Sequence, residues 1–340
     1  MRENHAAQEP QGAPKRIEVD ATLPTGLYEA ADDLGIVTAY FNPAGYRTRR
    51  INHDLFAQRI LASGLRLLTI ECALGEAAFE LPESPNVLRV RARTVLWHKE
   101  RLLNLGIARL PPECTKVAWL DGDLLFDNPA WAVETSRLLD DHAVVQPFVC
   151  PLRMLEGGRR ARDPHRRGFA VSRAHDPASP DSGSAWVHGE TGLAWAAQRS
   201  VVADAGLYDA MVVGGADHVM AHAFGGGWSS GCIDHILGRD TAYRRHAQAW
   251  FDRLPADALG SMAFVEGTAY HLWHGKPEHR AYKARHEGLH SFDYDPATDI
   301  RRGPEGCWEW ASPKPELHRW VVEYFARRRE DGAGSGSAEP

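Results

Sequence analysis

Cysteine is scarce in this chain of 340 residues, and the few cysteines are scattered along it. No two of them form a Cys-x-x-Cys pair, and their number is odd. This pattern argues against a disulfide scaffold or a zinc ribbon as the basis of the fold. We expect each to be a small buried hydrophobic residue. The five are Cys72, Cys114, Cys150, Cys232 and Cys307.

The sequence also lacks long apolar runs and an excess of basic residues. No stretch approaches the ~20 apolar residues needed to cross a bilayer, and residues 1–20 have no apolar centre of the kind found in secretory signals. With 39 bases against 45 acids, the formal net charge is −6, which does not suit general binding of nucleic-acid phosphates. We therefore expect no nucleic-acid partner, no integral membrane segment, and a cytoplasmic location compatible with peripheral attachment to a membrane.

What is present is the composition of a globular protein, with 44% hydrophobic and 25% charged residues. Residues 1–30 are polar and lack periodicity, so we expect a flexible N-terminal arm, and residues 331–340 are expected to be a disordered tail. Between them we expect a single domain over residues 31–330. Residues 156–184 carry six arginines among Gly, Pro, Asp and Ser. This long loop is either a clamp for an anionic substrate or a solvated mobile segment.

Short apolar runs alternate with segments of helical spacing, which predicts an α/β fold with a mostly parallel sheet flanked by helices. Ligands in such sheets bind at the carboxyl ends of the strands, where Glu71 and Asp121–Asp123 are expected. The expected strands are Gly35–Tyr40, Leu65–Ile70, Val87–Val90, Lys116–Leu120 and Ala269–Trp273, and the expected helices are Asn52–Ala62, Val95–Ile107, Asp217–Phe224 and Pro315–Arg329.

The segment Asp121-Gly122-Asp123 follows an apolar strand directly. Two carboxylates separated by one small residue can both bind a hard cation such as Mg²⁺ or Mn²⁺. Such an ion keeps coordination positions open for phosphate oxygens. A solvated turn with a helix-capping aspartate is the alternative. His271 and His274 lie three residues apart at a later strand end, and imidazole beside carboxylate favours Mn²⁺. An ordinary histidine pair is the alternative there.

Two further segments have both a functional and a structural interpretation. Gly214-Gly215 precedes Asp217 at the start of a helix, where Asp217 is either an N-cap or a general base for an acceptor hydroxyl. Lys99 stands near the start of another helix, which is a place to bind phosphate. A solvated helix face is the alternative.

In these motifs the sequence resembles glycosyltransferases of the GT-A fold, in particular family 2-type bacterial enzymes and the β-1,4-galactosyltransferases. The resemblance runs from about Ile36 to Tyr282. It rests on four motifs in order: Lys99–Gly106, Ala118–Asp123, Gly189–Ala197 with Gly214–Asp217, and His271–His274. It implies a nucleotide-binding half over residues 31–150 and an acceptor and metal half over residues 185–290.

The resemblance also implies roles for single residues. Lys99 takes the position that meets the donor diphosphate, together with Asp121 and Gly122. Asp123 and His274 match metal ligands, and His271 falls where the galactosyltransferases carry methionine. Asp217 matches the position of the general base that acts on the acceptor hydroxyl. The remaining implied contacts are the acceptor-side Gly192, Gly214, Gly215 and His218, and the donor-side Thr38, Tyr40 and Glu71.

The resemblance thus implies transfer of a sugar, with inversion, from a nucleotide-diphosphate sugar such as a UDP-sugar to a carbohydrate or other hydroxyl acceptor, with Mn²⁺ or Mg²⁺ as cofactor. The segment around Asp217 departs from the galactosyltransferases, because Ala216 and His218 flank a single acid. Acceptor identity is therefore not carried over. Two other functions stay open: a phosphatase of the haloacid-dehalogenase type, from Trp119–Phe126, and a non-catalytic carbohydrate-binding protein with sugar-stacking tryptophans.

Overall fold

The computed structural model describes residues 17–163 and 167–332. The strands are β1 (Ile17–Asp20), β2 (Leu34–Phe41), β3 (Arg66–Leu74), β4 (Val87–Ala92), β5 (Lys116–Leu120), β6 (Leu124–Phe126), β7 (Val144–Gln146), β8 (Cys150–Met154), β9 (Arg160–Asp163), β10 (Ala194–Gln198), β11 (Met262–Phe264), β12 (Thr268–His271), β13 (Ile300–Arg302) and β14 (Trp308–Trp310).

The α-helices are α1 (Arg47–Ala62), α2 (Lys99–Ile107), α3 (Trp131–Leu138), α4 (Phe169–His175), α5 (Ala185–His188), α6 (Ala216–Gly225), α7 (Gly231–Leu237), α8 (Ala242–Phe251), α9 (Ala284–His290), α10 (Pro296–Asp299) and α11 (Pro315–Ala326). Short 3₁₀ helices are η1 (Ser179–Ser182), η2 (Arg199–Val202), η3 (Ala256–Ala258) and η4 (Pro277–Arg280). No helix within the described ranges is both long and apolar enough to cross a bilayer.

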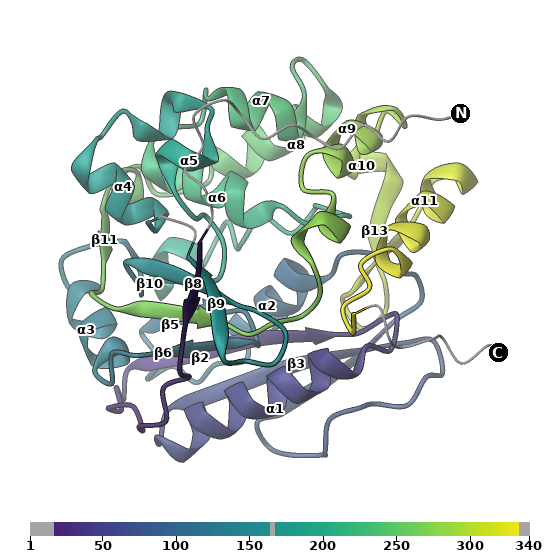
Figure 1. The fold of residues 1–340 in the computed structure, drawn as a ribbon. Coiled ribbons are helices and arrows are strands. Elements are labelled where there is room, and N and C mark those ends of the chain that lie inside the picture. Colours follow the sequence, from purple (N-terminus) through teal and green to yellow (C-terminus); the bar gives the residue numbers. More distant parts are fainter. Residues whose placement is uncertain (1–16, 164–166, 333–340) are drawn as a thin grey trace.

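A seven-stranded sheet in the order β11-β7-β10-β5-β2-β3-β4 forms the centre of the fold (Figure 1). The pairs β5–β2, β2–β3, β3–β4 and β11–β7 are parallel, while β10 runs antiparallel to both β5 and β7. The predicted mostly parallel α/β sheet flanked by helices is therefore confirmed. Strand β10 comes from the expected second half and lies between strands of the first, so the two halves share one sheet.

Hydrophobic cores fill both faces of this sheet, since successive residues of a strand point to opposite faces. Ile36 of β2 belongs to the same buried cluster as Phe56 of α1. Its neighbour Val37 belongs to the other cluster, with Leu102 of α2 and Val219 of α6. In Figure 1, α1 accordingly lies below β2 and β3, and helices α5 to α8 lie above the sheet.

A second sheet, ordered β1-β9-β8-β12-β6, brings late residues back to the end of β5. Strand β6 follows β5 after the short turn at residues 121–123, and it pairs antiparallel with β12 so that Leu124 faces His271. The amide of Leu272 also donates to the carbonyl oxygen of Asp123 at 2.9 Å. This pairing determines the position of the candidate site.

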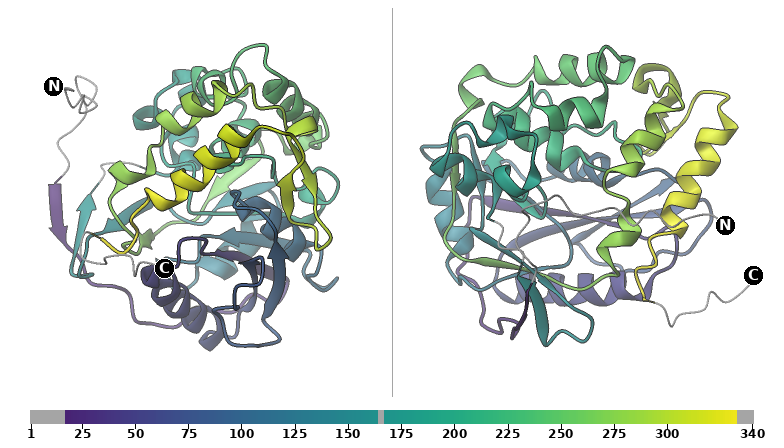
Figure 2. Two further views of the ribbon diagram at one scale, coloured as in Figure 1. Left: turned by 90° about the vertical axis from the view of Figure 1, so that its right-hand side faces the viewer. Right: turned by 45° about the horizontal axis from the view of Figure 1, so that its top comes forward.

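The C-terminal segment after α11 returns to the start of α1 (Figure 2). Asp331 accepts hydrogen bonds from the backbone amides of Arg47 and Thr48 at 3.0 and 2.8 Å, and Tyr46 donates its hydroxyl to the carbonyl of Phe325. The expected disordered tail is thus corrected at its first residues, because Asp331 caps a helix. Residues 333–340 lie outside the described residues.

The expected flexible arm over residues 1–30 needs a similar correction. Residues 1–16 are outside the described part, but Ile17–Asp20 forms β1, paired antiparallel with β9. Tyr28 is buried, and its hydroxyl accepts from the amide of Phe126 at 3.0 Å. The partners of β1 and Tyr28 lie far away in the sequence, so the polar local composition did not indicate these contacts.

The arginine-rich segment 156–184 is likewise not a plain loop where the structure describes it. It contains β9, α4 and η1, and Arg173 donates to the carbonyl of Gly225 at 2.7 Å. Residues 164–166 are outside the described part. A further correction concerns Glu71, which lies within β3 rather than at its end, because pairing with β4 extends that strand to Leu74.

Candidate functional site

Asp123, His271 and His274 converge at the end of β5. One ligand atom from each lies within 4.8 Å of the others. His274 Nε2 is 3.2 Å from Asp123 Oδ2, His271 Nε2 is 3.6 Å from Asp123 Oδ1, and the two imidazole Nε2 atoms are 2.9 Å apart. Both histidines are buried, and the Asp123 side chain is 16% exposed. These three residues are among the four predicted metal ligands, of which Asp121 is the fourth.

The charges around the cluster perturb its protonation. Burial raises the pKa of Asp123, but the neighbouring imidazoles outweigh this and hold the pKa below its ordinary value. Burial, helped by the positive charge of Arg280, lowers the pKa of His274 to about 3. The neutral imidazole and ionised carboxylate that result are the protonation states that bind a metal ion.

The donor set fits a divalent ion. Asp123 Oδ1 and His274 Nδ1 are buried and have no hydrogen-bond partner within the described ranges. A buried carboxylate oxygen without a donor costs free energy, and a cation would remove that cost. One oxygen and two nitrogens leave open coordination positions, and this mixture suits Mn²⁺ better than Ca²⁺.

Glu330 supports the cluster from behind. Its side chain is 1% exposed and forms ion pairs with Arg49 at 2.5 Å and Arg328 at 2.6 Å. Burial raises the pKa of Glu330, but the two guanidinium groups outweigh this and hold it well below the usual range. Its Oε2 lies 3.7 Å from His274 Nδ1. A carboxylate behind a ligating histidine orients the ring and increases its basicity.

Lys99 lies between the carboxylates of Asp121 and Asp217, two other predicted site residues. Its Nζ lies 2.5 Å from Asp121 Oδ1 and 2.9 Å from Asp217 Oδ2. The structure therefore places the predicted diphosphate-binding lysine between the D-x-D segment and the predicted base. Asp121 does not belong to the Asp123 cluster among the residues described, so its role as a metal ligand stays a prediction.

Asp217 does not cap α6. The cap position is Gly215, and Asp217 lies in the first helical turn. Its carboxylate accepts a hydrogen bond from Lys99. Gly215 has φ +107°, and a Cβ there would lie 2.8 Å from His286. Gly214 has φ +78° and lies against Trp97. The glycine pair thus permits a left-handed turn and close packing, which set the direction of the helix that carries Asp217.

Gly192 lies beside the acids on the acceptor side. A Cβ at this position would be 3.5 Å from Glu190 Oε1 and 3.7 Å from Asp217 Oδ2. Glu190 also pairs with Arg153 at 2.7 Å, and Arg153 Nη1 is 3.4 Å from His271 Nδ1. A chain of polar contacts therefore extends from the Asp123 cluster to the neighbourhood of Asp217.

Thr38 and Gly122 support the D-x-D turn from the neighbouring strand. The buried Thr38 hydroxyl donates to the carbonyl of Leu120 at 2.8 Å. A Cβ on Gly122 would lie 3.3 Å from Thr38 Oγ1 and 3.4 Å from the ring of His53. The turn between the two aspartates is thus closely packed, and we expect a larger residue at Gly122 to displace it.

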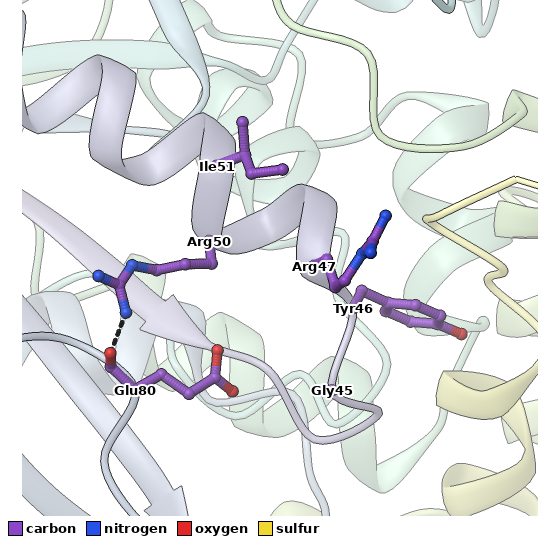
Figure 3. Close-up of a pocket in the computed structure, with 6 residues that line it drawn as sticks. All are labelled: Gly45, Tyr46, Arg47, Arg50, Ile51 and Glu80. Carbon is purple, nitrogen blue, oxygen red and sulfur yellow. Dashed lines mark hydrogen bonds between the residues drawn. The ribbon is translucent and has the colours of Figure 1, made fainter. Parts of the chain in front are cut away.

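Tyr40 and Glu71 are bound to the loop after β3. The Tyr40 hydroxyl donates to the Glu80 carboxylate, and Glu71 Oε1 accepts from the amides of Glu80 and Leu81. Beside this loop is a surface hollow of about 590 Å³ (Figure 3). It is lined by Gly45, Tyr46, Arg47, Arg50, Ile51 and Glu80, and so by no residue of the Asp123 cluster. The structure does not bring Tyr40 or Glu71 into that cluster.

Sequence reasoning missed Glu100, which follows Lys99. Its side chain is 2% exposed, and Oε2 accepts from the Trp97 indole at 3.1 Å. Burial, followed by the nearby Asp217 carboxylate, raises the pKa of Glu100 to about 8. No local signal indicated this, because an acid next to a lysine at a helix start is typical of a solvated face.

Sequence reasoning also missed a histidine and cysteine cluster made of His188, His218, His222 and Cys232. His218, predicted on the acceptor side, lies in this cluster. Cys232 is half-buried, as is Cys150, whereas the other three cysteines are buried as expected. The His-x₃-His spacing on α6 was the available signal, since residues four apart share a helix face.

No known protein-family model matches this chain, and none of the curated proteins compared with it is similar in sequence.

Proposed function

We propose that this protein transfers a sugar from a nucleotide-diphosphate sugar, such as a UDP-sugar, to an acceptor hydroxyl with inversion at the anomeric carbon. The observation that carries the proposal is the convergence of Asp123, His271 and His274 beside the Lys99 network. The order of the four motifs adds support, since their resemblance to GT-A glycosyltransferases links the same residues.

Asp123, His271 and His274 would hold the divalent ion, with Mn²⁺ favoured over Mg²⁺ by the imidazole ligands. When bound, this ion supplies positive charge that stabilises the diphosphate leaving group. Glu330 lies behind His274, with its Oε2 3.7 Å from Nδ1, and Asp121 is held by Lys99 at the same strand end.

Lys99 and Asp217 take the two other parts of the reaction. Lys99 offers an ammonium group to the diphosphate oxygens, and Asp217 accepts the proton of the acceptor hydroxyl. The hydroxyl oxygen then bonds to the anomeric carbon from the face opposite the nucleotide, and the bond from that carbon to the diphosphate oxygen breaks. Attack from the opposite face inverts the configuration. A positioned base typically contributes about 10²–10⁴-fold to the rate.

A thermal-shift measurement tests the donor site. UDP-glucose, UDP-galactose and UDP are added with Mn²⁺ or with EDTA. A ligand present at about 100 times its Kd stabilises the folded state by about 2.7 kcal/mol. We expect at least one of these ligands to raise Tm with Mn²⁺ but not with EDTA, and Asp123→Asn to abolish this shift.

The matched control is Asp141→Asn, which removes an exposed carboxylate after α3 and should leave the shift unchanged. If a nucleotide with Mn²⁺ still raises the Tm of Asp123→Asn, the donor site lies elsewhere. Metal-dependent hydrolysis of p-nitrophenyl phosphate would favour a phosphatase. Sugar affinity without metal or nucleotide would favour a carbohydrate-binding protein.

A further inference from the structure

Three histidines and a cysteine lie together above the sheet, separate from the Asp123 cluster. His188 ends α5, His218 and His222 share one face of α6, and Cys232 lies in the first turn of α7. One ligand atom from each lies within 4.8 Å of all the others. His188 and His222 are fully buried, and His218 and Cys232 are half-buried.

The three imidazole rings lie close to one another. Their centroids are separated by 4.7 Å for His218–His222, 4.8 Å for His188–His222 and 4.9 Å for His188–His218. Cys232 Sγ lies 3.5 Å from His188 Nε2. With zinc–nitrogen bonds of about 2.0–2.1 Å and a zinc–sulfur bond of about 2.3 Å, a tetrahedral site separates its ligand atoms by about 3.3–3.6 Å. The measured contact between sulfur and nitrogen falls in this range.

Hydrogen bonds outside the cluster hold two of the rings in a metal-binding orientation. His188 Nδ1 lies 3.0 Å from the carbonyl oxygen of Gly189, and His222 Nδ1 lies 3.1 Å from that of Gly227. A protonated Nδ1 that donates to a carbonyl leaves the Nε2 lone pair for a metal. His222 Nε2 is buried and has no hydrogen-bond partner in the part of the chain that is described.

Glycine at position 227 makes the second of these contacts possible. A Cβ on Gly227 would lie 2.7 Å from His222 Nδ1 and 2.5 Å from the side chain of Pro180. The Ser230 hydroxyl is also 3.1 Å from His222 Nδ1. Neighbours therefore fix the Nδ1 edge of the ring, and the buried Nε2 has no hydrogen-bond partner among the described residues.

We propose that His188, His218, His222 and Cys232 bind a Zn²⁺ ion. Three nitrogens and one sulfur supply four protein ligands, the number that a tetrahedral zinc ion takes in structural sites. Thiolate and imidazole favour Zn²⁺ over the hard ions Mg²⁺ and Ca²⁺. On binding, the Cys232 thiol releases its proton to solvent, and the imidazoles bind in their neutral form.

The ion would fasten α5, α6 and α7 to one another. His218 directly follows Asp217, whose carboxylate points to Lys99, so the zinc would also fix the first turn of α6. This site differs in ligands and in place from the proposed sugar-transfer centre. Its existence does not depend on that function.

Metal analysis of the full chain tests the proposal. The protein is purified without chelators and dialysed against metal-free buffer, and its zinc is measured by mass spectrometry. We expect one zinc per chain in the wild type and in the variant Asp123→Asn/His274→Asn. We expect none in His222→Gln/Cys232→Ser. Absence of zinc from the wild type even after dialysis with added Zn²⁺ would overturn the proposal, as would retention by His222→Gln/Cys232→Ser.

Cobalt supplies a second readout, which the wild type alone already gives. Co²⁺ in place of zinc should give the intense visible bands of a tetrahedral ion and a near-ultraviolet band from thiolate to cobalt. Cys232→Ser should lose the thiolate band, and the matched control Cys150→Ser, at the other half-buried cysteine, should keep it. Bound Co²⁺ without a thiolate band in the wild type would overturn the proposal.

Discussion

Lys99 is the residue whose removal tests the electrostatics of the candidate site most directly. Its ammonium group lies between the carboxylates of Asp121 and Asp217, at 2.5 and 2.9 Å. The Lys99 side chain is 15% exposed, and those of Asp121 and Asp217 are 27% and 22% exposed. Lys99→Met keeps the length of the side chain and removes its charge, so it leaves two largely buried carboxylates without their cation.

Removing one partner of a buried ion pair typically costs about 3–5 kcal/mol, because the remaining charge stays desolvated. Since about a quarter of each aspartate is exposed, solvent relieves part of that penalty. We therefore expect Lys99→Met to lower the free energy of unfolding by about 3 kcal/mol. The measurement is urea unfolding at pH 7.5 with EDTA, which keeps metal ions out of the comparison.

Lys116→Met is a matched control. Lys116 also pairs with two aspartates at similar distances, Asp33 at 2.9 Å and Asp140 at 2.5 Å. The difference is solvent, because these carboxylates are 39% and 63% exposed. Exposed pairs contribute about 0–1 kcal/mol each, so we expect the loss of the two pairs to cost less than about 2 kcal/mol. Equal losses in the two variants would refute the reasoning from burial.

Three further substitutions test other parts of the site. Asp217→Asn should leave the Mn²⁺-dependent nucleotide shift intact and lower turnover by about 10²–10⁴-fold; unchanged turnover would remove Asp217 from the reaction. Glu100 has a pKa raised to about 8, so it stabilises the fold below about pH 4.5 and loses that contribution as the pH rises towards 8. The unfolding free energy of Glu100→Gln relative to the wild type should therefore rise between pH 5 and pH 8, by up to about 3 kcal/mol, and parallel pH profiles would contradict this. Glu330→Gln should lower the free energy of unfolding, measured with urea, by about 3 kcal/mol. Glu323→Gln breaks an ion pair in which the glutamate side chain is 46% exposed, so it should lower the free energy of unfolding by less than about 1 kcal/mol. Comparable losses at the two positions would count against a supporting role for Glu330.

Some of the local elements were accessible from the sequence, while others, among them β1 and α7 to α10, were not predicted. The apolar run Lys116–Leu120 became β5 with the expected bounds, and the segment beginning at Pro315 became α11. These elements follow from hydrophobic periodicity and from glycine and proline at their ends, which act over a few residues. Boundaries that depend on a partner were less accurate, as for β3, which pairing with β4 extends past Glu71.

The candidate metal ligands were found because each carried a local signal. Asp123 follows an apolar strand, and His271 and His274 stand at the end of another. Glu330 carried no such signal: it lies beyond the last helix, and ion pairs with Arg49 and Arg328 hold it beside His274. The histidine and cysteine cluster was missed for a related reason, since its members come from three helices whose packing no local pattern describes.

By itself, the amino-acid sequence indicated several of the strands and helices, such as β5 and α11, and the acids and imidazoles at Asp121–Asp123 and His271–His274. The tertiary structure decided which of those side chains meet. The register of β12 against β6 places His271 beside Asp123, and the return of the chain after α11 brings Glu330 to His274. Propensity and periodicity act between near neighbours in the chain, whereas these contacts depend on the order of strands and the packing of helices over the whole core.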